Sequence, residues 1–426
     1  MAVQTIEIAP GVTGRYIPAQ QFKTTRITVQ LLTPLNLKTV SRNAMLPFIL
    51  TRACKAYPDL KSLNSKLASL YGAALMADVS KIGNMHSLAF TISSINDKYA
   101  LDNSSVAGEC AKLLISMLFN PLLDGARFNE KLFESEKRLF LERIDGEINE
   151  KRRYAISRAE NIMCETEPYG ISKYGPRAMA QGLTSGELYL AWEELLKTAI
   201  ININFIGDGD PAPVYDAFKK AISSIERLPL SAVDQSVSHE ISGKSVTERM
   251  AVTQSKLVMG FKSDITCKSE LYMPAVVFCD LYGGSPHSKL FQNVREKLSL
   301  CYYCAARYNR SNGIILVDSG IQEENAEHAR SEIIKQLDEI KSGNVSDEEL
   351  SASKAALTDS AKSVNDSQYA MDTWYGQRSL DGDIVSPHQF AEMINNVTKE
   401  QVIEVSKHFN LDTTYLLAPN GGNSDE

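Results

Sequence analysis

The most distinctive stretch of this sequence runs from residue 281 to residue 302 and reads LYGGSPHSKLFQNVREKLSLCY. A Gly-rich turn near its start separates two helical patterns, which cover about 268–282 and 286–297. The stretch ends in the apolar alternation of a strand over 300–309. It therefore predicts two helices, joined by a turn, that lead into a strand.

Outside this stretch, the hydrophobic pattern changes repeatedly between the two-residue period of strands and the 3.6-residue period of helices. Capping-box sequences at 184–187 and 346–349 mark the starts of two of the helices. The predicted strands cover 3–9, 24–32, 88–94, 200–206, 249–262, 300–309, 312–321 and 412–418. The predicted helices cover about 43–70, 103–118, 128–162, 211–226, 268–282, 286–297, 324–342 and 346–380, with others starting at 184, 386 and 398.

The order of these elements is similar in residues 1–227 and 248–418. Between them, residues 228–247 read LPLSAVDQSVSHEISGKSVT, a Ser-rich stretch with little helical periodicity that is typical of a linker. Residues 419–426 form a polar, Gly-containing tail. Strands that follow one another without an intervening helix favour an α+β fold over a doubly wound parallel sheet. We expect two homologous domains, each an antiparallel-dominated sheet with helices packed on one face.

Composition narrows the class of protein. The 426 residues are 43% hydrophobic and 23% charged with a net charge of −7, so the chain is globular and a poor candidate for binding nucleic acid. We find no secretory signal and no run of about 20 apolar residues. Seven scattered cysteines do not form a disulfide framework, which favours the cytoplasm. The pair Cys301 and Cys304 suits a redox or zinc site less well than two small buried residues of a strand.

Residues 281–302 resemble the C-terminal signature of the pitrilysin/insulinase family of zinc metallopeptidases, which includes mitochondrial processing peptidase. The shared features are the glycines, Ser288, Leu290-Phe291, Arg295-Glu-Lys297 and Tyr302 at the family spacing. Weaker similarities at 70–73, 169–175, 206–208 and 254–261 extend the resemblance over nearly the whole chain. The run RNAMLPFIL, with YPDL and LYGA after it, resembles a bacterial insulinase-like branch associated with modification of elongation factor P.

The sequence differs from the active members of the family at the zinc-binding motif. Active members carry H-x-x-E-H on the first long helix, in which two histidines bind zinc and the glutamate is the general base. These positions correspond here to Ala44, Pro47 and Phe48, and the third family ligand corresponds to Glu136. The six histidines lie more than five residues apart in sequence, so none replaces the motif: His86, His239, His287, His328, His388 and His408. We therefore expect no metal or other cofactor on this chain and no hydrolysis by it alone.

What the resemblance leaves is the substrate-binding part of the family's machinery. In the family, an Arg and a Tyr seven residues apart contact the peptide near the scissile bond, and they correspond to Arg295 and Tyr302. The glycines of the turn, Gly283 and Gly284, belong to the same expected substrate-binding set. The resemblance thus implies a non-catalytic subunit that supplies Arg and Tyr contacts to a peptide or small protein held by a zinc-bearing sister subunit.

Two other hypotheses stay open at this point. The chain could be an inert scaffold or peptide-binding module that reuses the peptidase fold, and a homodimer is compatible with either role. Alternatively, the chemistry could have moved to Cys164 or to the pair Cys301 and Cys304, although no His–Cys neighbourhood is visible in the sequence.

Overall fold

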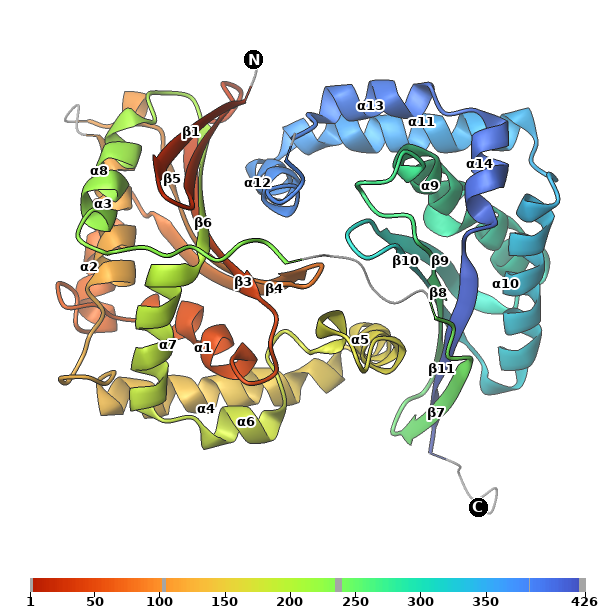
Figure 1. Cartoon of the computed structure of the whole chain (residues 1–426), viewed down its shortest axis with the longest axis horizontal. Coiled ribbons are helices and arrows are strands. Elements are labelled where there is room, and N and C mark those ends of the chain that lie inside the picture. Colours follow the sequence, from red (N-terminus) through yellow and green to blue (C-terminus); the bar gives the residue numbers. More distant parts are fainter. Residues whose placement is uncertain (1–2, 102–104, 234–239, 383, 421–426) are drawn as a thin grey trace. The chain divides into compact units, whose positions relative to one another are not determined.

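The computed structural model describes residues 3–101, 105–233, 240–382 and 384–420 (Figure 1). Within these ranges the chain forms two compact units, and neither unit is continuous in sequence. Unit 1 comprises residues 1–145, 172–234 and 365–384, and unit 2 comprises residues 146–171, 235–364 and 385–426. Each unit contains one sheet and its own set of helices, which confirms the α+β class.

Unit 1 is built on a six-stranded sheet with the order β1-β2-β6-β3-β5-β4. All neighbouring strands are antiparallel except β2 and β6, which are parallel. The strands are β1 (Gln4–Ala9), β2 (Val12–Pro18), β3 (Thr24–Pro34), β4 (Ala74–Ile82), β5 (Met85–Ile95) and β6 (Ile200–Gly207). The helices are α1 (Val40–Leu50), α2 (Leu60–Ser69), α3 (Val106–Phe119), α4 (Glu130–Gly146), α6 (Arg177–Gly182), α7 (Ser185–Thr198) and α8 (Ala212–Ile222), together with α12 (Gln368–Gln377).

Unit 2 is built on a five-stranded sheet with the order β7-β11-β8-β10-β9, in which only the β7–β11 pair is parallel. The strands are β7 (Lys244–Met250), β8 (Ser255–Lys262), β9 (Cys301–Asn309), β10 (Ile314–Ile321) and β11 (Asn410–Pro419). The helices are α5 (Lys151–Met163), α9 (Tyr272–Cys279), α10 (Ala326–Lys341), α11 (Asp347–Ser363), α13 (Pro387–Asn395) and α14 (Lys399–Ser406). Two segments with π-helical turns, η4 (Asp280–Gly284) and η5 (Phe291–Lys297), follow α9.

The two longest predicted helices are each interrupted, which the sequence pattern did not indicate. The pattern over 128–162 breaks at the 3₁₀ turn Glu147–Asn149, directly after Gly146, whose helix propensity is low. The pattern over 346–380 breaks at Val364–Asp366, and Ser367 then starts a new helix by accepting a hydrogen bond from the backbone N–H of Ala370. In each case the second half belongs to the other unit from the first half.

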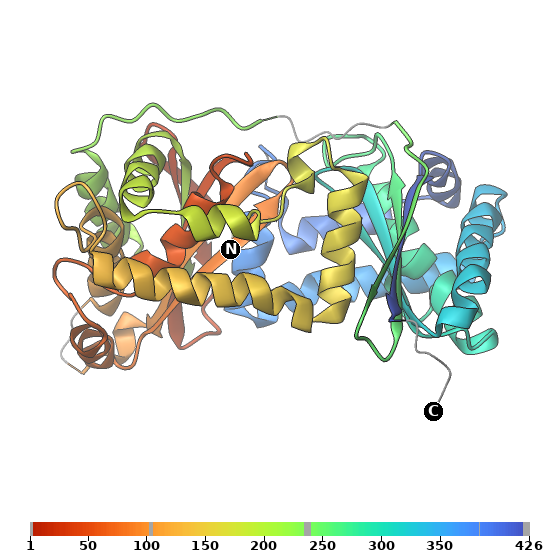
Figure 2. The ribbon, with the colours of Figure 1, turned by 90° about the horizontal axis from the view of Figure 1, so that it is seen from below.

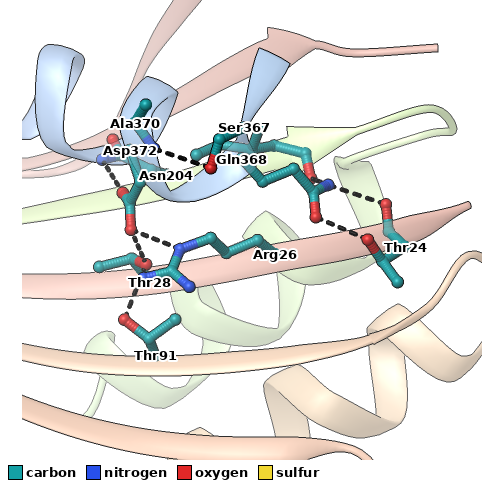
Figure 3. Close-up of polar contacts among 10 residues, drawn as sticks. Thr24, Arg26, Thr28, Thr91, Asn204, Ser367, Gln368, Ala370 and Asp372 are labelled. Atoms are coloured by element: carbon teal, nitrogen blue, oxygen red, sulfur yellow. Dashed lines mark hydrogen bonds and ion pairs between the residues drawn. The ribbon is translucent and has the colours of Figure 1, made fainter. Parts of the chain in front are cut away.

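Each of these second halves lies on the sheet face opposite the main helical layer. In β3, Ile27 and Val29 face the core of unit 1, whereas Arg26 and Thr28 face α12. Asp372 on α12 accepts hydrogen bonds from Arg26 Nε at 2.8 Å and from Thr28 Oγ1 at 2.6 Å (Figure 3). Unit 1 therefore holds α12 through a buried ion pair.

In unit 2, α5 lies against the sheet in the equivalent way (Figure 2). Arg152 Nε donates to Asp318 Oδ2 of β10 at 2.5 Å. A glycine in β8 allows the close approach of the helix, because a Cβ added to Gly260 would lie 2.5 Å from the sulfur of Met163. Each unit is thus completed by a helix from a distant part of the chain.

Several boundaries also differ from the prediction. The pattern over 43–70 is two helices, because a capping box at Asp59 starts α2 anew. The strand at 249–262 is β7 and β8, and β7 already begins at Lys244, inside the expected linker 228–247. Residues 234–239 of that linker and 421–426 of the expected tail lie outside the described residues. β2 and β4 were not predicted, because Gly14 interrupts the apolar pattern of one and β4 alternates only weakly.

Candidate functional site

The residues expected at the family's zinc-motif positions lie on α1 of unit 1. Ala44 and Pro47 are buried, and Phe48 is half-buried. Pro47 lies inside the helix, and the hydroxyl of Thr51 donates to its carbonyl oxygen at 2.8 Å. The face that would present metal ligands in an active relative is therefore apolar in this chain.

Glu136 on α4 is the one carboxylate at the expected ligand positions, and it is only 6% exposed. Its Oε2 accepts a hydrogen bond from Nε of Arg52 at 3.3 Å. Burial raises the pKa of the Glu136 carboxyl above its usual range, and the positive charge of Arg52 only partly opposes this. Glu136 is thus a buried carboxylate whose interaction partner is a cation of the same chain.

Phe48 is the centre of a cluster of aromatic side chains on α1, α4 and the segment before α6. Its ring lies 6.1 Å from Phe140 and 6.4 Å from Tyr174, measured between ring centroids. The guanidinium of Arg143 lies 4.1 Å above the Phe48 ring, within the range of a cation–π contact. At the position where the resemblance implies a zinc-binding histidine, the chain therefore has an aromatic ring that contacts a cation.

A cavity of about 200 Å³ remains beside this cluster, and we call it the Glu136 cavity. Zinc sites in proteins need three or four nitrogen, sulfur or carboxylate ligands. The cavity offers one carboxylate and one threonine hydroxyl among two cations and apolar side chains, so it does not fit zinc. No group of three or more His, Cys, Asp or Glu residues that could hold a metal occurs among the described residues. The lining residues are Phe48, Thr51, Arg52, Leu75, Ala77, Glu136, Leu139, Phe140 and Arg143.

The second candidate site lies in unit 2, where Arg295 and Tyr302 line one cavity of about 480 Å³. We call it the Tyr302 cavity. Arg295 is on η5, and its guanidinium lies 4.5 Å above the ring of Phe291. Tyr302 is on β9, the edge strand of the sheet, and is 66% exposed. The complete lining is Arg295, Glu296, Ser299, Leu300, Cys301, Tyr302, Gln322 and Asn325.

Two backbone features position these side chains. Ser299 has a φ of +52°, a left-handed conformation that is uncommon for a residue with a side chain and that turns the chain from η5 into β9. In β9, Cys301 pairs with Ile321 and Tyr303 pairs with Gly320, so Tyr302 is an extra, bulged residue. Bulges redirect side chains and are frequent beside binding sites. The turn and the bulge together place Arg295 and Tyr302 around the same space.

The glycines of the signature do not line this cavity. Gly283 is buried, and a Cβ at this position would lie 2.7 Å from the Cβ of Ala306 on β9. Gly284 is exposed, and a Cβ there would lie 2.8 Å from Oδ1 of Asp280. The structure thus gives Gly283 a packing role between η4 and β9, and it brings together only Arg295 and Tyr302 of the expected substrate-binding residues.

Sequence reasoning missed most of the other residues around both cavities. Arg52 and Arg143 were not noted. Arg52 lies one helical turn after Phe48 in the sequence, and Arg143 lies two helical turns after Glu136. Cys301 was interpreted as a buried apolar residue, but it is half-buried and lines the Tyr302 cavity. No signal in the sequence indicates the bulge in β9 that places Cys301 beside the cavity.

These features define a class of protein: a two-unit α+β fold in which the positions expected to bind zinc carry no metal ligand set. Comparison with known proteins identifies the family. Residues 182–357 match a family described as "Peptidase M16 inactive domain". The chain is 31% identical over 414 residues, 97% of each chain, to a probable inactive metalloprotease, YmfF, of Bacillus subtilis.

Solved structures show the same fold. A conserved protein from Enterococcus faecalis covers 100% of both chains with a TM-score of 0.90 at 26% identity. A peptidase M16 inactive domain from Pseudomonas fluorescens also covers 100% of both chains, with a TM-score of 0.79 at 16% identity. This chain belongs to the M16 family, which is the pitrilysin/insulinase family, and it is similar to members described as inactive.

Proposed function

We propose that this chain is the non-catalytic, substrate-binding subunit of a heterodimeric zinc endopeptidase. In this proposal a sister subunit of the same family carries the zinc, and Arg295 and Tyr302 contact the backbone of the peptide that the sister subunit cleaves. The observation that carries the proposal is the Tyr302 cavity, in which both side chains face one space of about 480 Å³.

The chemistry of the two side chains suits this role. A guanidinium presents several N–H donors in a fixed plane, which matches the carbonyl oxygens of an extended peptide. A phenol can donate a hydrogen bond to the oxyanion that develops when water attacks the scissile carbonyl. One such donor is typically worth ~10²–10³-fold in rate. Neither role requires a metal on this chain.

The proposed location is the cytoplasm. All seven cysteines are free, as expected in a reducing compartment. Among the described residues, no helix is both long enough and apolar enough to cross a bilayer.

The test is to replace Tyr302 by Phe and to combine the variant with the zinc-bearing sister subunit. The substitution removes one exposed hydroxyl, so folding and subunit association should be unchanged. Cleavage of an unstructured peptide by the complex should fall by at least ~10-fold, given the usual contribution of an oxyanion donor.

Tyr369→Phe is a matched control, because Tyr369 is 67% exposed against 66% for Tyr302 and lies in unit 1. It should leave cleavage unchanged. If an intact Tyr302→Phe complex cleaves the peptide at the wild-type rate, the Arg/Tyr role is wrong and the scaffold hypothesis is favoured.

A further inference from the structure

The bulge in β9 has a second consequence, which concerns Cys301 and Cys304. In a regular strand, residues three apart lie on opposite faces of the sheet. Here Cys301 pairs with Ile321 and Cys304 pairs with Ser319, and these two partners are two residues apart on β10. Because Tyr302 is extra, both cysteines lie on the same face as neighbours along the strand.

The two thiols have different surroundings. Cys304 is 3% exposed, whereas Cys301 is half-buried and lines the Tyr302 cavity. The pKa of the Cys301 thiol is lowered to about 7, first by a hydrogen bond that the thiol of Cys304 donates to its sulfur and, against the opposing effect of burial, also by the Ser319 hydroxyl and the positive charge of Arg295. Cys301 is therefore accessible and rich in thiolate, and a second thiol lies directly behind it.

The other cysteines lack this combination. Cys54, Cys110, Cys164 and Cys279 are buried, and burial raises the pKa of the Cys110 thiol to about 11. Cys267 is half-buried like Cys301 but does not line the Tyr302 cavity. A nucleophilic thiolate with a neighbouring thiol is the arrangement found in reversible redox pairs.

We propose that Cys301 and Cys304 form a redox pair that a hydroperoxide oxidises to an intramolecular disulfide. The Cys301 thiolate attacks one peroxide oxygen, the O–O bond breaks, and the alkoxide or hydroxide that leaves takes a proton from water. Cys301 is then a sulfenic acid. The sulfur of Cys304 attacks the sulfur of Cys301, the S–O bond breaks, and the leaving hydroxide combines with the proton of Cys304 to form water. In total, two thiols lose two electrons and one peroxide is reduced.

This inference goes beyond the proposed function and does not depend on it. The oxidation requires only the two thiols, their shared face and access from the cavity. A chain that binds no peptide would still form the disulfide, and a chain that binds peptide could lack the reaction, so the two proposals fail separately.

The experiment is to treat the reduced full-length protein with one equivalent of hydrogen peroxide, to remove the excess with catalase and to digest it with trypsin. Cleavage after Lys297 and Arg307 releases residues 298–307, LSLCYYCAAR, which contain both cysteines in one peptide. We expect this peptide to lose the mass of two hydrogens, and dithiothreitol to restore it. The denatured protein should lose two of its seven thiols.

Three variants test the order of the steps. Cys304→Ser should stop at the sulfenic acid, which dimedone traps on residue 301, and Cys301→Ser should leave the 298–307 peptide unoxidised. Cys267→Ser is the matched control and should behave as the wild type. The proposal is overturned if the wild-type 298–307 peptide keeps both thiols while another cysteine is oxidised first. It is also overturned if all seven thiols survive one equivalent of peroxide.

Discussion

The Glu136 cavity of unit 1 and the Tyr302 cavity of unit 2 differ in volume and in how exposed their side chains are. In the Glu136 cavity, Arg52 binds Glu136 and Arg143 lies over Phe48, so the charges are satisfied within the chain. In the Tyr302 cavity, Arg295 also has partners within the chain, Glu296 at 3.6 Å and the ring of Phe291, but the space is more than twice as large and the Tyr302 phenol is exposed. The side chains of the Glu136 cavity mainly contact one another, whereas the Tyr302 cavity is the one to which we assign the proposed peptide contacts.

The difference bears on what a substitution in each cavity should do. The side chains around Phe48 pack closely on one another, so a change there removes buried contacts. We therefore expect substitutions around the Glu136 cavity to lower the stability of the protein, and substitutions around the Tyr302 cavity to lower its activity.

The largest effect on stability is expected for Phe140→Ala. Phe140 is 1% exposed, lines the Glu136 cavity and packs edge-to-face on Tyr174 at 5.7 Å. Loss of a buried phenyl ring costs about 3–5 kcal/mol. Both tryptophans, Trp192 and Trp374, lie in unit 1, so urea unfolding followed by tryptophan fluorescence reports on this unit.

Phe140→Leu is the control and should lose much less stability, because it keeps most of the apolar volume. Peptide cleavage per folded Phe140→Ala complex should be unchanged. An unfolding midpoint equal to that of the wild type would contradict the packed description of this cavity.

The next largest effect is expected for Arg295→Lys, which should lower the rate of peptide cleavage. The ammonium keeps the positive charge but cannot reproduce the planar set of donors, so cleavage by the heterodimer should fall ~10-fold with little change in stability. Arg138→Lys, an exposed surface position on α4, is the matched control. Equal cleavage by the two variants would show that Arg295 acts only through its charge.

The Tyr302 cavity also predicts a pH dependence of thiol alkylation. Because the pKa of Cys301 is about 7, its thiolate fraction and hence its reaction rate with iodoacetamide should rise with pH and level off above about pH 8. An ordinary thiol titrates near pH 8.5, so the native protein should react about tenfold faster than the denatured chain at pH 7. The measurement is the alkylation rate of residues 298–307 by mass spectrometry. A profile centred near pH 8.5 would contradict this environment.

The smallest effect is expected for Glu136→Gln. The direction of its change in stability with pH tests whether Glu136 is buried. Because burial raises the pKa of Glu136, the folded wild type holds this proton more tightly than the unfolded chain does. The wild type therefore loses stability as pH rises from the usual glutamate pKa through the raised one, and the variant does not. Glu136→Gln should gain about 1 kcal/mol or less relative to wild type between pH 4 and pH 8. A Glu136→Gln variant that is relatively less stable than the wild type at pH 8 would contradict the burial argument.

Much of this molecule could be predicted from its sequence. The α+β class followed from periodicity, the family from residues 281–302, and the missing zinc motif from Ala44, Pro47 and Phe48 and from the spacing of the histidines. Most strands and capped helix starts were also found, because capping boxes such as that at Thr184 are local signals.

What could not be predicted depends on long-range packing. The breaks at Glu147–Asn149 and Val364–Asp366 lie inside continuous helical patterns, and only the tertiary structure shows that α5 and α12 each pack on a distant sheet. The ion pair of Arg52 with Glu136 joins residues 84 apart in sequence. The bulge at Tyr302 depends on pairing with β10, and it alone brings Cys301 and Cys304 to one face.

The most direct test of the central claim compares one change in each cavity within the same reconstituted heterodimer. The rate of zinc-dependent peptide cleavage is measured for Tyr302→Phe in unit 2 and for Arg143→Gln in unit 1, after both complexes are shown to be intact. We predict that Tyr302→Phe lowers the rate by at least ~10-fold and that Arg143→Gln leaves it unchanged. A wild-type rate for Tyr302→Phe, or a comparable loss for Arg143→Gln, would contradict the assignment of substrate contacts to unit 2.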